Sequence, residues 1–127
     1  MTIVDTSALI DSLTGPKRSA GRLRELIATG ERLLLPTLVL YDWWRGPRRD
    51  EELAAQEALF PREEALQFGV EEALAASRLY QQVSRPRGRE LDLAIAAHAI
   101  VREAKLWSLN VAAFEDIPGL EMAPLNG

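Results

Sequence analysis

The sequence predicts an α/β fold, in which a mainly parallel sheet is flanked by helices on both faces. Short apolar strands alternate along the chain with one or two helices, which is the order that builds parallel sheets. Two of the expected strands end in a polar residue, Asp5 and Asn110. Ligands in such folds bind beyond the carboxyl ends of the strands, so these two residues are the first functional signal.

The composition is that of one globular domain. The chain has 127 residues, of which 47% are hydrophobic, and no linker divides it, so we expect a single domain over residues 1–127. The absence of cysteine excludes disulfides, thiolate zinc sites and cysteine nucleophiles, and it fits a reducing cytosol. No signal peptide or bilayer-spanning run is recognisable, so we expect a cytoplasmic protein with no membrane partner.

The first elements follow from apolar periodicity and from glycine and proline breaks. The segment "TIV" is a short buried strand, and the helical pattern after it stops at a Gly-Pro pair. A second helix has apolar residues at i, i+3 and i+4 on one face and Gly30 just past its end. We therefore expect a strand at Thr2–Val4 and helices at Thr6–Leu13 and Ser19–Ala28.

The middle of the chain predicts a second strand and two more helices. "RLLLP" is a strand at Leu33–Leu35, ended by a proline. Thr37 can cap the next helix, which contains two adjacent tryptophans and is broken by a Gly-Pro pair at 46–47. Arg49–Leu59 is an amphipathic helix, and "ALQF" at 65–68 is a candidate short strand.

The last part of the chain alternates helices and strands. A helix with Leu74, Leu79 and Val83 facing inward is separated by the polar loop "RPRGRE" from an alanine-rich helix. The expected elements are helices at Val70–Ser84 and Leu91–Ala104, the strand "LWSLN" ending at Asn110, a turn over Val111–Asp116 and a strand near Leu120–Ala123.

Four polar residues lie where this fold could gather them, namely Asp5, Asp42, Asp92 and Asn110. Each has an ordinary structural explanation: a helix N-cap, an ion pair with an arginine three residues on, a helix-dipole interaction and a turn, respectively. Converging carboxylates, however, repel one another and raise a pKa, and Mg²⁺ or Mn²⁺ relieves that conflict. The set would suit metal-assisted phosphodiester hydrolysis.

The segments "IVDTSALID", "LPTLVLYDWWRG", "ELDLAIAAHAI" and "LWSLNVAAFEDIPGL" together resemble the PIN domain, as found in VapC-like toxins of bacterial toxin–antitoxin systems. The resemblance covers nearly the whole chain, in family order and spacing. It implies a Rossmann-like PIN fold with three layers and a Mg²⁺- or Mn²⁺-dependent endoribonuclease. It also implies a cognate VapB-like antitoxin as inhibitor, and a homodimer.

Carried over by motif, the resemblance makes Asp5 the first acidic metal ligand and Asp92 the third, with Asn110 at a position that the family fills with Asn or Asp. Asp42 stands where the family usually has Glu, which moves its oxygens by about 1 Å in a site that demands near-octahedral geometry. Ala113 stands where many members carry an Asp. A site for one metal ion is therefore expected more firmly than a site for two. The alternative function is that of a PIN-like module that binds RNA or an antitoxin without efficient cleavage.

Hydroxyl and arginine side chains complete the expected site. Thr6 could contact the scissile phosphate, because a helix N-terminus favours anions, or it could be an N-cap. Ser108 is expected near the same place, and Arg87 and Arg89 are the candidates for contacts to RNA phosphates. The formal net charge of −4 argues weakly against a nucleic-acid partner, but the arginines are clustered rather than spread.

The remaining distinctive residues have structural explanations. Trp43 and Trp44 cannot both face one core, so one of them is expected in a groove or interface, for which the resemblance offers an antitoxin segment. His98 is expected to pack in or on its helix. A phosphotransfer domain that uses Asp5 is a remote alternative, because no strand-end lysine is present to partner the phosphate.

Overall fold

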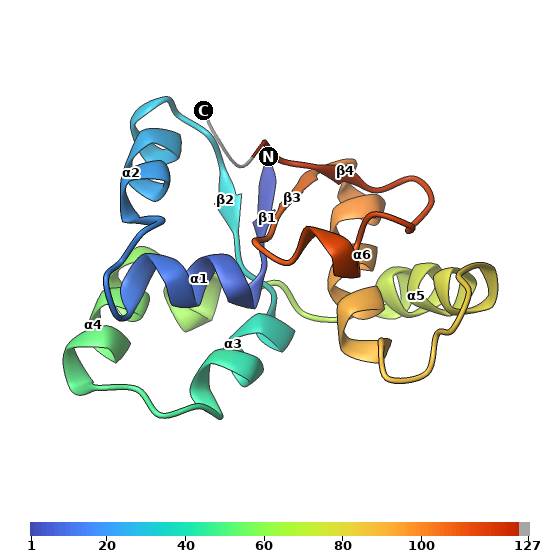
Figure 1. Ribbon diagram of the computed structural model, residues 1–127, viewed down its shortest axis with the longest axis horizontal. Helices are drawn as coiled ribbons and strands as arrows, with labels where there is room; N and C mark the ends of the chain where they lie inside the picture. The colour runs from blue at the N-terminus through green and yellow to red at the C-terminus, as the bar shows by residue number, and fades with distance from the viewer. Residues whose placement is uncertain (125–127) are drawn as a thin grey trace.

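A four-stranded parallel sheet in the order β2-β1-β3-β4 lies at the centre of residues 1–124, the part of the chain that this computed structural model describes (Figure 1). The central strand β1 pairs in parallel with both β2 and β3, and Ile3 lies opposite Leu34 on one side and Leu106 on the other. The predicted α/β class with a parallel sheet is confirmed. The strands are β1 (Thr2–Val4), β2 (Leu33–Leu34), β3 (Lys105–Trp107) and β4 (Glu121–Met122).

Helices flank this sheet. In the view of Figure 1, α1 to α4 lie to the left of the strands and below them, and α5 and α6 lie to the right. No helix in residues 1–124 is long and apolar enough to cross a membrane. The helices of this part of the chain are α1 (Thr6–Leu13), α2 (Ala20–Ala28), α3 (Thr37–Trp44), α4 (Asp50–Leu59), α5 (Val70–Gln82) and α6 (Glu90–Arg102), with short 3₁₀ helices η1 (Arg62–Glu64) and η2 (Val111–Ala113).

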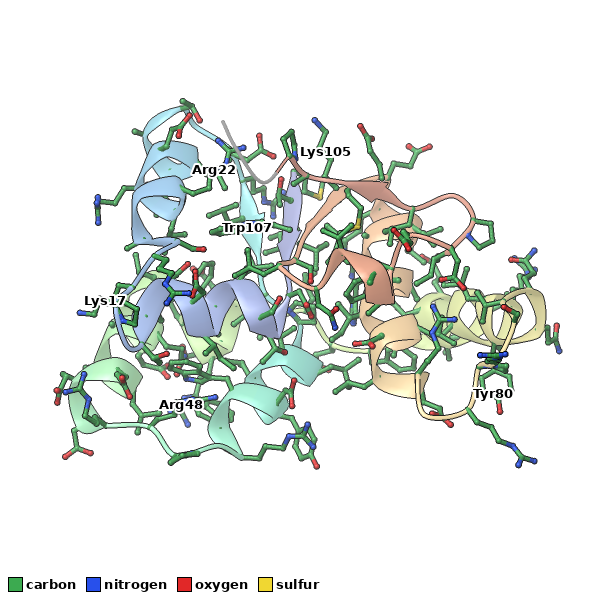
Figure 2. The ribbon with its side chains drawn as sticks, viewed as in Figure 1. Lys17, Arg22, Arg48, Tyr80, Lys105 and Trp107 are labelled. Atoms are coloured by element: carbon green, nitrogen blue, oxygen red, sulfur yellow. The ribbon has the colours of Figure 1, made fainter. Side chains whose placement is uncertain are left out.

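The hydrophobic core holds the carboxyl ends of β1 and β3 in fixed positions. Ile3 and Leu106 are fully buried in the two central strands, and Leu9 of α1 and Leu93 of α6 pack with them. Trp107, the last residue of β3, is also buried, in the interior beside the strands (Figure 2). Burying a large apolar side chain contributes about 1.5–3 kcal/mol to the stability of the fold. The packed strands therefore hold the residues that follow β1 and β3 in place.

Two predicted boundaries differ from the structure at the site and at α3. Asn110 does not end a strand, because β3 stops at Trp107 and the next N–H groups donate to serine hydroxyls instead. Thr37 is not the cap of α3. Pro36 holds that position, and the Thr37 N–H donates to the carbonyl of Leu66.

Two further predictions about the middle of the chain are wrong in part. The segment "ALQF" is not a strand. It forms one isolated parallel bridge, between Pro36 and Leu66. Leu74 does not face inward: Leu79 of α5 and Val83, which follows the helix, are buried, whereas Leu74 is 50% exposed.

Candidate active site

Asp5 lies at the carboxyl end of β1, between the strand and α1. Its backbone N–H donates to the carbonyl of Trp107, which continues the pairing of β1 with β3. Asp5 occupies the N-cap position of α1, but its side chain makes no capping hydrogen bond. Instead its Oδ2 accepts hydrogen bonds from Ser108 Oγ at 2.7 Å and from Ser7 Oγ at 3.1 Å. Asp5 is only 5% exposed, and these two hydroxyls satisfy one of its oxygens. The capping explanation for its side chain is therefore wrong.

Ser7 and Ser108 fasten the segment after β3 to the start of α1. The Leu109 N–H donates to Ser7 Oγ at 2.9 Å, and the Asn110 N–H donates to Ser108 Oγ at 3.0 Å. The two hydroxyl oxygens lie 3.1 Å apart, on the same carboxylate oxygen. Ser108 is fully buried, so it orients Asp5 rather than offering the phosphate contact suggested by the sequence.

Asp5 and Asp42 each lie within electrostatic reach of Asp92. Asp92 is in the first turn of α6 and is partly buried. Burial raises the pKa of Asp92, the negative charges of Asp5 and Asp42 raise it further, and the Arg89 guanidinium opposes them. The structure thus brings together three predicted acids from β1, α3 and α6.

These acids are not equally available. Arg45 forms an ion pair with Asp42 one helical turn away, which is the pairing that the sequence allowed. Within residues 1–124, no three Asp, Glu or His side chains are grouped closely enough to hold a metal ion. Asn110 is exposed and occupies the N-cap position of the short helix η2, three residues beyond the end of β3, but its side chain makes no capping hydrogen bond. Asp5 and Asp92 are therefore the more available acids of the set.

The polar groups around Asp5 nevertheless have the chemistry that a hydrated divalent cation requires. Carboxylate oxygens are the preferred ligands of Mg²⁺ and Mn²⁺, and after burial the repulsion from Asp5 and Asp42 adds to the raised pKa of Asp92. The hydroxyl of Thr6, next to Asp5, is buried and has no hydrogen-bond partner within the described residues. Leaving such a group unsatisfied costs about 1–3 kcal/mol, which a cation or its water ligand would relieve. The chemistry of these oxygen groups thus fits a divalent cation that keeps several water ligands, although within residues 1–124 no three acids lie close enough to hold it by themselves.

The two arginines expected to contact phosphate differ in their surroundings. Arg89 donates to the carboxylate of Asp116 at 3.0 Å and to the carbonyl oxygens of Ala113 and Ser84 at 3.1 and 3.2 Å. It therefore connects the loop around η2 to the start of α6, and both of its terminal nitrogens already donate to the protein. The Arg89 guanidinium also lowers the pKa of Asp116. Arg87 is exposed in the loop before α6.

The structure confirms that the two tryptophans do not both face the core and that His98 packs in the interior. Trp43 is fully buried and its neighbour Trp44 is 40% exposed, so only one of the two faces the core. His98 is fully buried in α6, where its ring contacts the ring of Phe68 edge to face at 5.8 Å. Burial, aided by the nearby Arg102 charge, lowers the pKa of His98 to about 4, so its ring is neutral at physiological pH.

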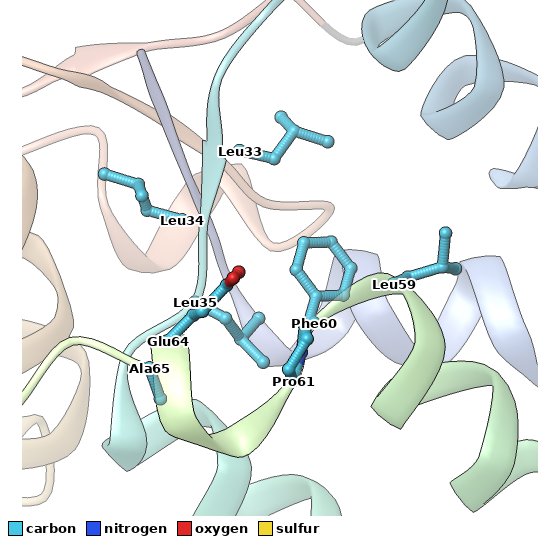
Figure 3. A pocket seen from close by; sticks show the side chains of 8 residues that line it. All are labelled: Leu33, Leu34, Leu35, Leu59, Phe60, Pro61, Glu64 and Ala65. Carbon is cyan, nitrogen blue, oxygen red and sulfur yellow. The ribbon is translucent and has the colours of Figure 1, made fainter.

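A small cavity of about 50 Å³ lies away from the acids, beside β2 (Figure 3). Its apolar lining and its single carboxylate, Glu64, offer no set of converging polar groups. The lining residues are Leu33, Leu34, Leu35, Leu59, Phe60, Pro61, Glu64 and Ala65. The candidate active site is therefore the acidic edge, not this cavity.

Sequence reasoning missed the orienting roles of Ser7 and Ser108. A local sequence pattern cannot reveal that Ser7 meets a residue 101 positions away. The sequence offers only a weak signal for these roles. Ser7 lies two residues beyond Asp5, and Ser108 directly follows β3, the strand that pairs with β1.

Comparison with known proteins gives consistent results. A family model described as "PIN domain" matches residues 2–119. The chain is 36% identical over 123 residues to a protein named Ribonuclease VapC19 in two strains of Mycobacterium tuberculosis, which covers 95% of this chain and 98% of that protein. Its fold is similar to that of DNA-bound VapBC from Salmonella typhimurium (TM-score 0.74, 22% identity, 96% of both chains) and of FitAcB from Neisseria gonorrhoeae (TM-score 0.73, 16% identity, 100% of both).

Proposed function

The chain is a VapC-like member of the PIN domain family, and we propose that it is a Mg²⁺- or Mn²⁺-dependent endoribonuclease toxin that hydrolyses RNA phosphodiester bonds. The observation that carries this proposal is the placement of Asp5, buried and oriented by Ser7 and Ser108, within electrostatic reach of Asp92, whose pKa is raised first by burial and then by the charges of Asp5 and Asp42. A protein named a ribonuclease, 36% identical over 95% of the chain, supports the same activity.

In this proposal Asp5 and Asp92 hold the cation, Asp42 adds a third carboxylate and Asn110 assists. A bound divalent cation would supply the positive charge that polarises a phosphoryl oxygen and acidifies a water. Ser7 and Ser108 occupy Oδ2 of Asp5 and so fix the direction of the other carboxylate oxygen, Oδ1.

Thr6 is the candidate phosphate contact in this arrangement. It is the first residue of α1, where unpaired N–H groups and the helix dipole favour an anion. Its hydroxyl is buried and has no partner within residues 1–124, so we propose that Thr6 contacts the phosphate through its backbone N–H. Arg87 is exposed and could follow the RNA backbone, whereas Arg89 would act through the η2 loop that it fastens.

The partners are part of the same proposal. We infer a VapB-like antitoxin that inhibits the protein, a homodimer, and a single domain over residues 1–127. Support for the antitoxin comes from the similar solved structures, several of which are described as VapBC or toxin–antitoxin complexes.

The direct test is cleavage of a mixed RNA pool in Mg²⁺ or Mn²⁺. We expect the wild type to cut, Asp5→Ala to be inactive and the matched control Glu63→Ala, which changes an exposed acid in η1, to cut normally. Equal cleavage by the wild type and Asp5→Ala would exclude this assignment.

A second candidate function is binding of RNA or an antitoxin without efficient cleavage. It is favoured by the ion pair that occupies Asp42, by Ala113 in place of an acid and by the lack of a three-ligand group within the described residues. Ala113→Asp separates the two functions. Cleavage that appears only in this variant would make the natural chain a binding module.

A further inference from the structure

The guanidinium of Arg89, at the N-cap position of α6, is directed toward the segment that contains η2. Each of its terminal nitrogens donates to one carboxylate oxygen of Asp116, so the two groups form a bidentate ion pair. The same nitrogens donate to the carbonyl of Ala113 at 3.1 Å and to that of Ser84, just beyond α5, at 3.2 Å. A bidentate pair fixes the direction of both groups as well as the distance between them.

A second carboxylate lies within reach of the same guanidinium. Asp92 is three residues beyond Arg89, which is a spacing that allows an ion pair at the start of a helix. The pKa of Arg89 is raised mainly by its hydrogen bond to Asp116 and less by the charge of Asp92. Burial and neighbouring acids raise the pKa of Asp92, and the charge of Arg89 opposes that rise. Arg89 thus has two carboxylates to choose between, and it is paired with the one beyond η2.

The pair of Asp42 and Arg45 shows the result when no other carboxylate competes for the arginine. These two residues have the same spacing of three, and they form an ion pair on α3. Arg45 thereby occupies a carboxylate of the proposed site. Among the ion pairs of residues 1–124, by contrast, none includes Asp92, because Arg89 is paired with Asp116.

Asp116 is held in place by the core on either side of it. Phe114 and Ile117 are both buried and pack in the hydrophobic core. The Ile117 N–H donates to the carbonyl of Phe114 at 3.1 Å, so the backbone turns tightly at Asp116. The backbone therefore keeps the Asp116 carboxylate where it can hold the Arg89 guanidinium away from Asp92.

We propose that Asp116 is a positioning residue, which holds the Arg89 guanidinium on the η2 segment and so leaves the Asp92 carboxylate available to the cation. The inference rests on the proposed function, in which Asp92 is a metal ligand. Asp116 acts only through Arg89 and contacts neither the cation nor RNA in this arrangement. Without the Asp116 charge, the guanidinium would pair with Asp92 and compete with the cation. Changes to such outer partners typically weaken metal binding by roughly 10- to 100-fold.

The test measures binding of Mn²⁺ to the full chain without RNA, by electron paramagnetic resonance of the unbound ion. Asp116→Asn keeps the size of the side chain and removes its charge, so we expect Mn²⁺ binding to weaken by roughly 10-fold or more. Arg89→Gln removes the competing cation, and we expect a smaller loss. The variant with both changes should bind Mn²⁺ like Arg89→Gln, and more tightly than Asp116→Asn, because no guanidinium remains to pair with Asp92.

Two further variants separate this role from the general loss of an ion pair. Asp116→Glu keeps the charge and should retain most of the wild-type affinity for Mn²⁺. Glu57→Gln breaks another ion pair in which two guanidinium nitrogens meet one carboxylate, that of Arg62 between α4 and η1. It should bind Mn²⁺ like the wild type. Urea unfolding of each variant in EDTA verifies that the fold is kept.

A crystal structure of metal-free Asp116→Asn locates the guanidinium directly, and we expect Arg89 to pair with Asp92 in it. The inference would be overturned if Arg89 stayed on the η2 segment, or if Asp116→Asn bound Mn²⁺ like the wild type. It would also be overturned if the variant with both changes bound Mn²⁺ no more tightly than Asp116→Asn. These results would leave the proposed function standing. A wild type that binds no Mn²⁺ would instead exclude the proposed cation, and the crystal structure would still decide whether Asp116 holds Arg89 away from Asp92.

Discussion

Ser108 Oγ donates a hydrogen bond of 2.7 Å to Asp5 Oδ2, although the two residues are 103 positions apart in the sequence. The bond is buried, and Ser108 Oγ also accepts the N–H of Asn110. One hydroxyl therefore connects the end of β1, the end of β3 and the loop that leads to η2. The orientation of the Asp5 carboxylate depends on a contact between two distant strands, not on the turn in which Asp5 lies.

Ser108→Ala should weaken both the fold and the candidate active site. It removes the buried donor to Asp5 and leaves the Asn110 N–H without its acceptor, which should lower the free energy of unfolding by about 1–3 kcal/mol. RNA cleavage should fall as well, because Asp5 is no longer fixed. Urea unfolding and cleavage assays measure the two effects. Ser77→Ala, at an exposed serine of α5, is the control, and equal behaviour of the two variants would contradict the orienting role.

Asp92→Asn should stabilise the metal-free protein at neutral pH. Because burial and neighbouring charges raise the pKa of Asp92 in the folded protein, its ionised form destabilises the fold above that pKa, and the effect disappears as the pH falls through it. The variant should therefore unfold at a higher temperature than the wild type at pH 7 in EDTA, with the difference closing in acid. Glu63→Gln, at an exposed acid, should change neither value. A gain of the same size at all pH values would contradict this origin.

Much of the fold could be predicted because its signals are local. The boundaries of β1 and α1 follow from an apolar run, a polar residue and a helical pattern, and both match the structure. The ion pair of Asp42 with Arg45 was also accessible, since it needs only a spacing of three residues on one helix. Periodicity placed Leu74 in the core wrongly, because it marks an apolar stripe but not how far the neighbouring helix covers that stripe.

The site could be predicted only as a set of candidates. From the sequence, Asp5 is equally compatible with a helix cap and with a metal ligand. The hydroxyls that decide the orientation of its carboxylate come from Ser7 in α1 and from Ser108, just after β3. Arg89 looked like a free cation in the polar loop, but Asp116 and two carbonyl groups use its donors. The apolar letters of "LWSLN" suggested a longer strand, while serine hydroxyls accept the N–H groups of Leu109 and Asn110.

Mg²⁺ or Mn²⁺ should raise the unfolding temperature of the wild type. A ligand that binds only the folded state adds roughly 2.7 kcal/mol at a concentration one hundred times its Kd. The rise should be absent in Asp5→Asn and small in Asp92→Asn, because each removes a carboxylate from the proposed ligand set. Scanning calorimetry with and without the metal measures it, and titration calorimetry gives the number of ions. An equal rise in Asp5→Asn would place the cation elsewhere.

His98 should make the protein sensitive to mild acid. Its pKa is about 4 in the folded protein, below the ordinary 6.5, because the ring is buried and the Arg102 guanidinium lies beside its Nδ1, while Glu72 opposes this effect. Since the unfolded chain binds the proton more tightly, stability is lost as the pH falls from the unfolded pKa toward the folded one, by at most about 3 kcal/mol.

The variant that checks the histidine effect is His98→Gln, which keeps a polar group of similar size beside Arg102 and cannot be protonated in this range. Its free energy of unfolding should be lower than that of the wild type at pH 7, because packing against Phe68 is lost, but should change less between pH 6.5 and pH 4. Urea unfolding across this range, with Glu63→Gln as the control, compares the slopes. Parallel curves for the wild type and His98→Gln would assign the acid sensitivity to the carboxylates instead.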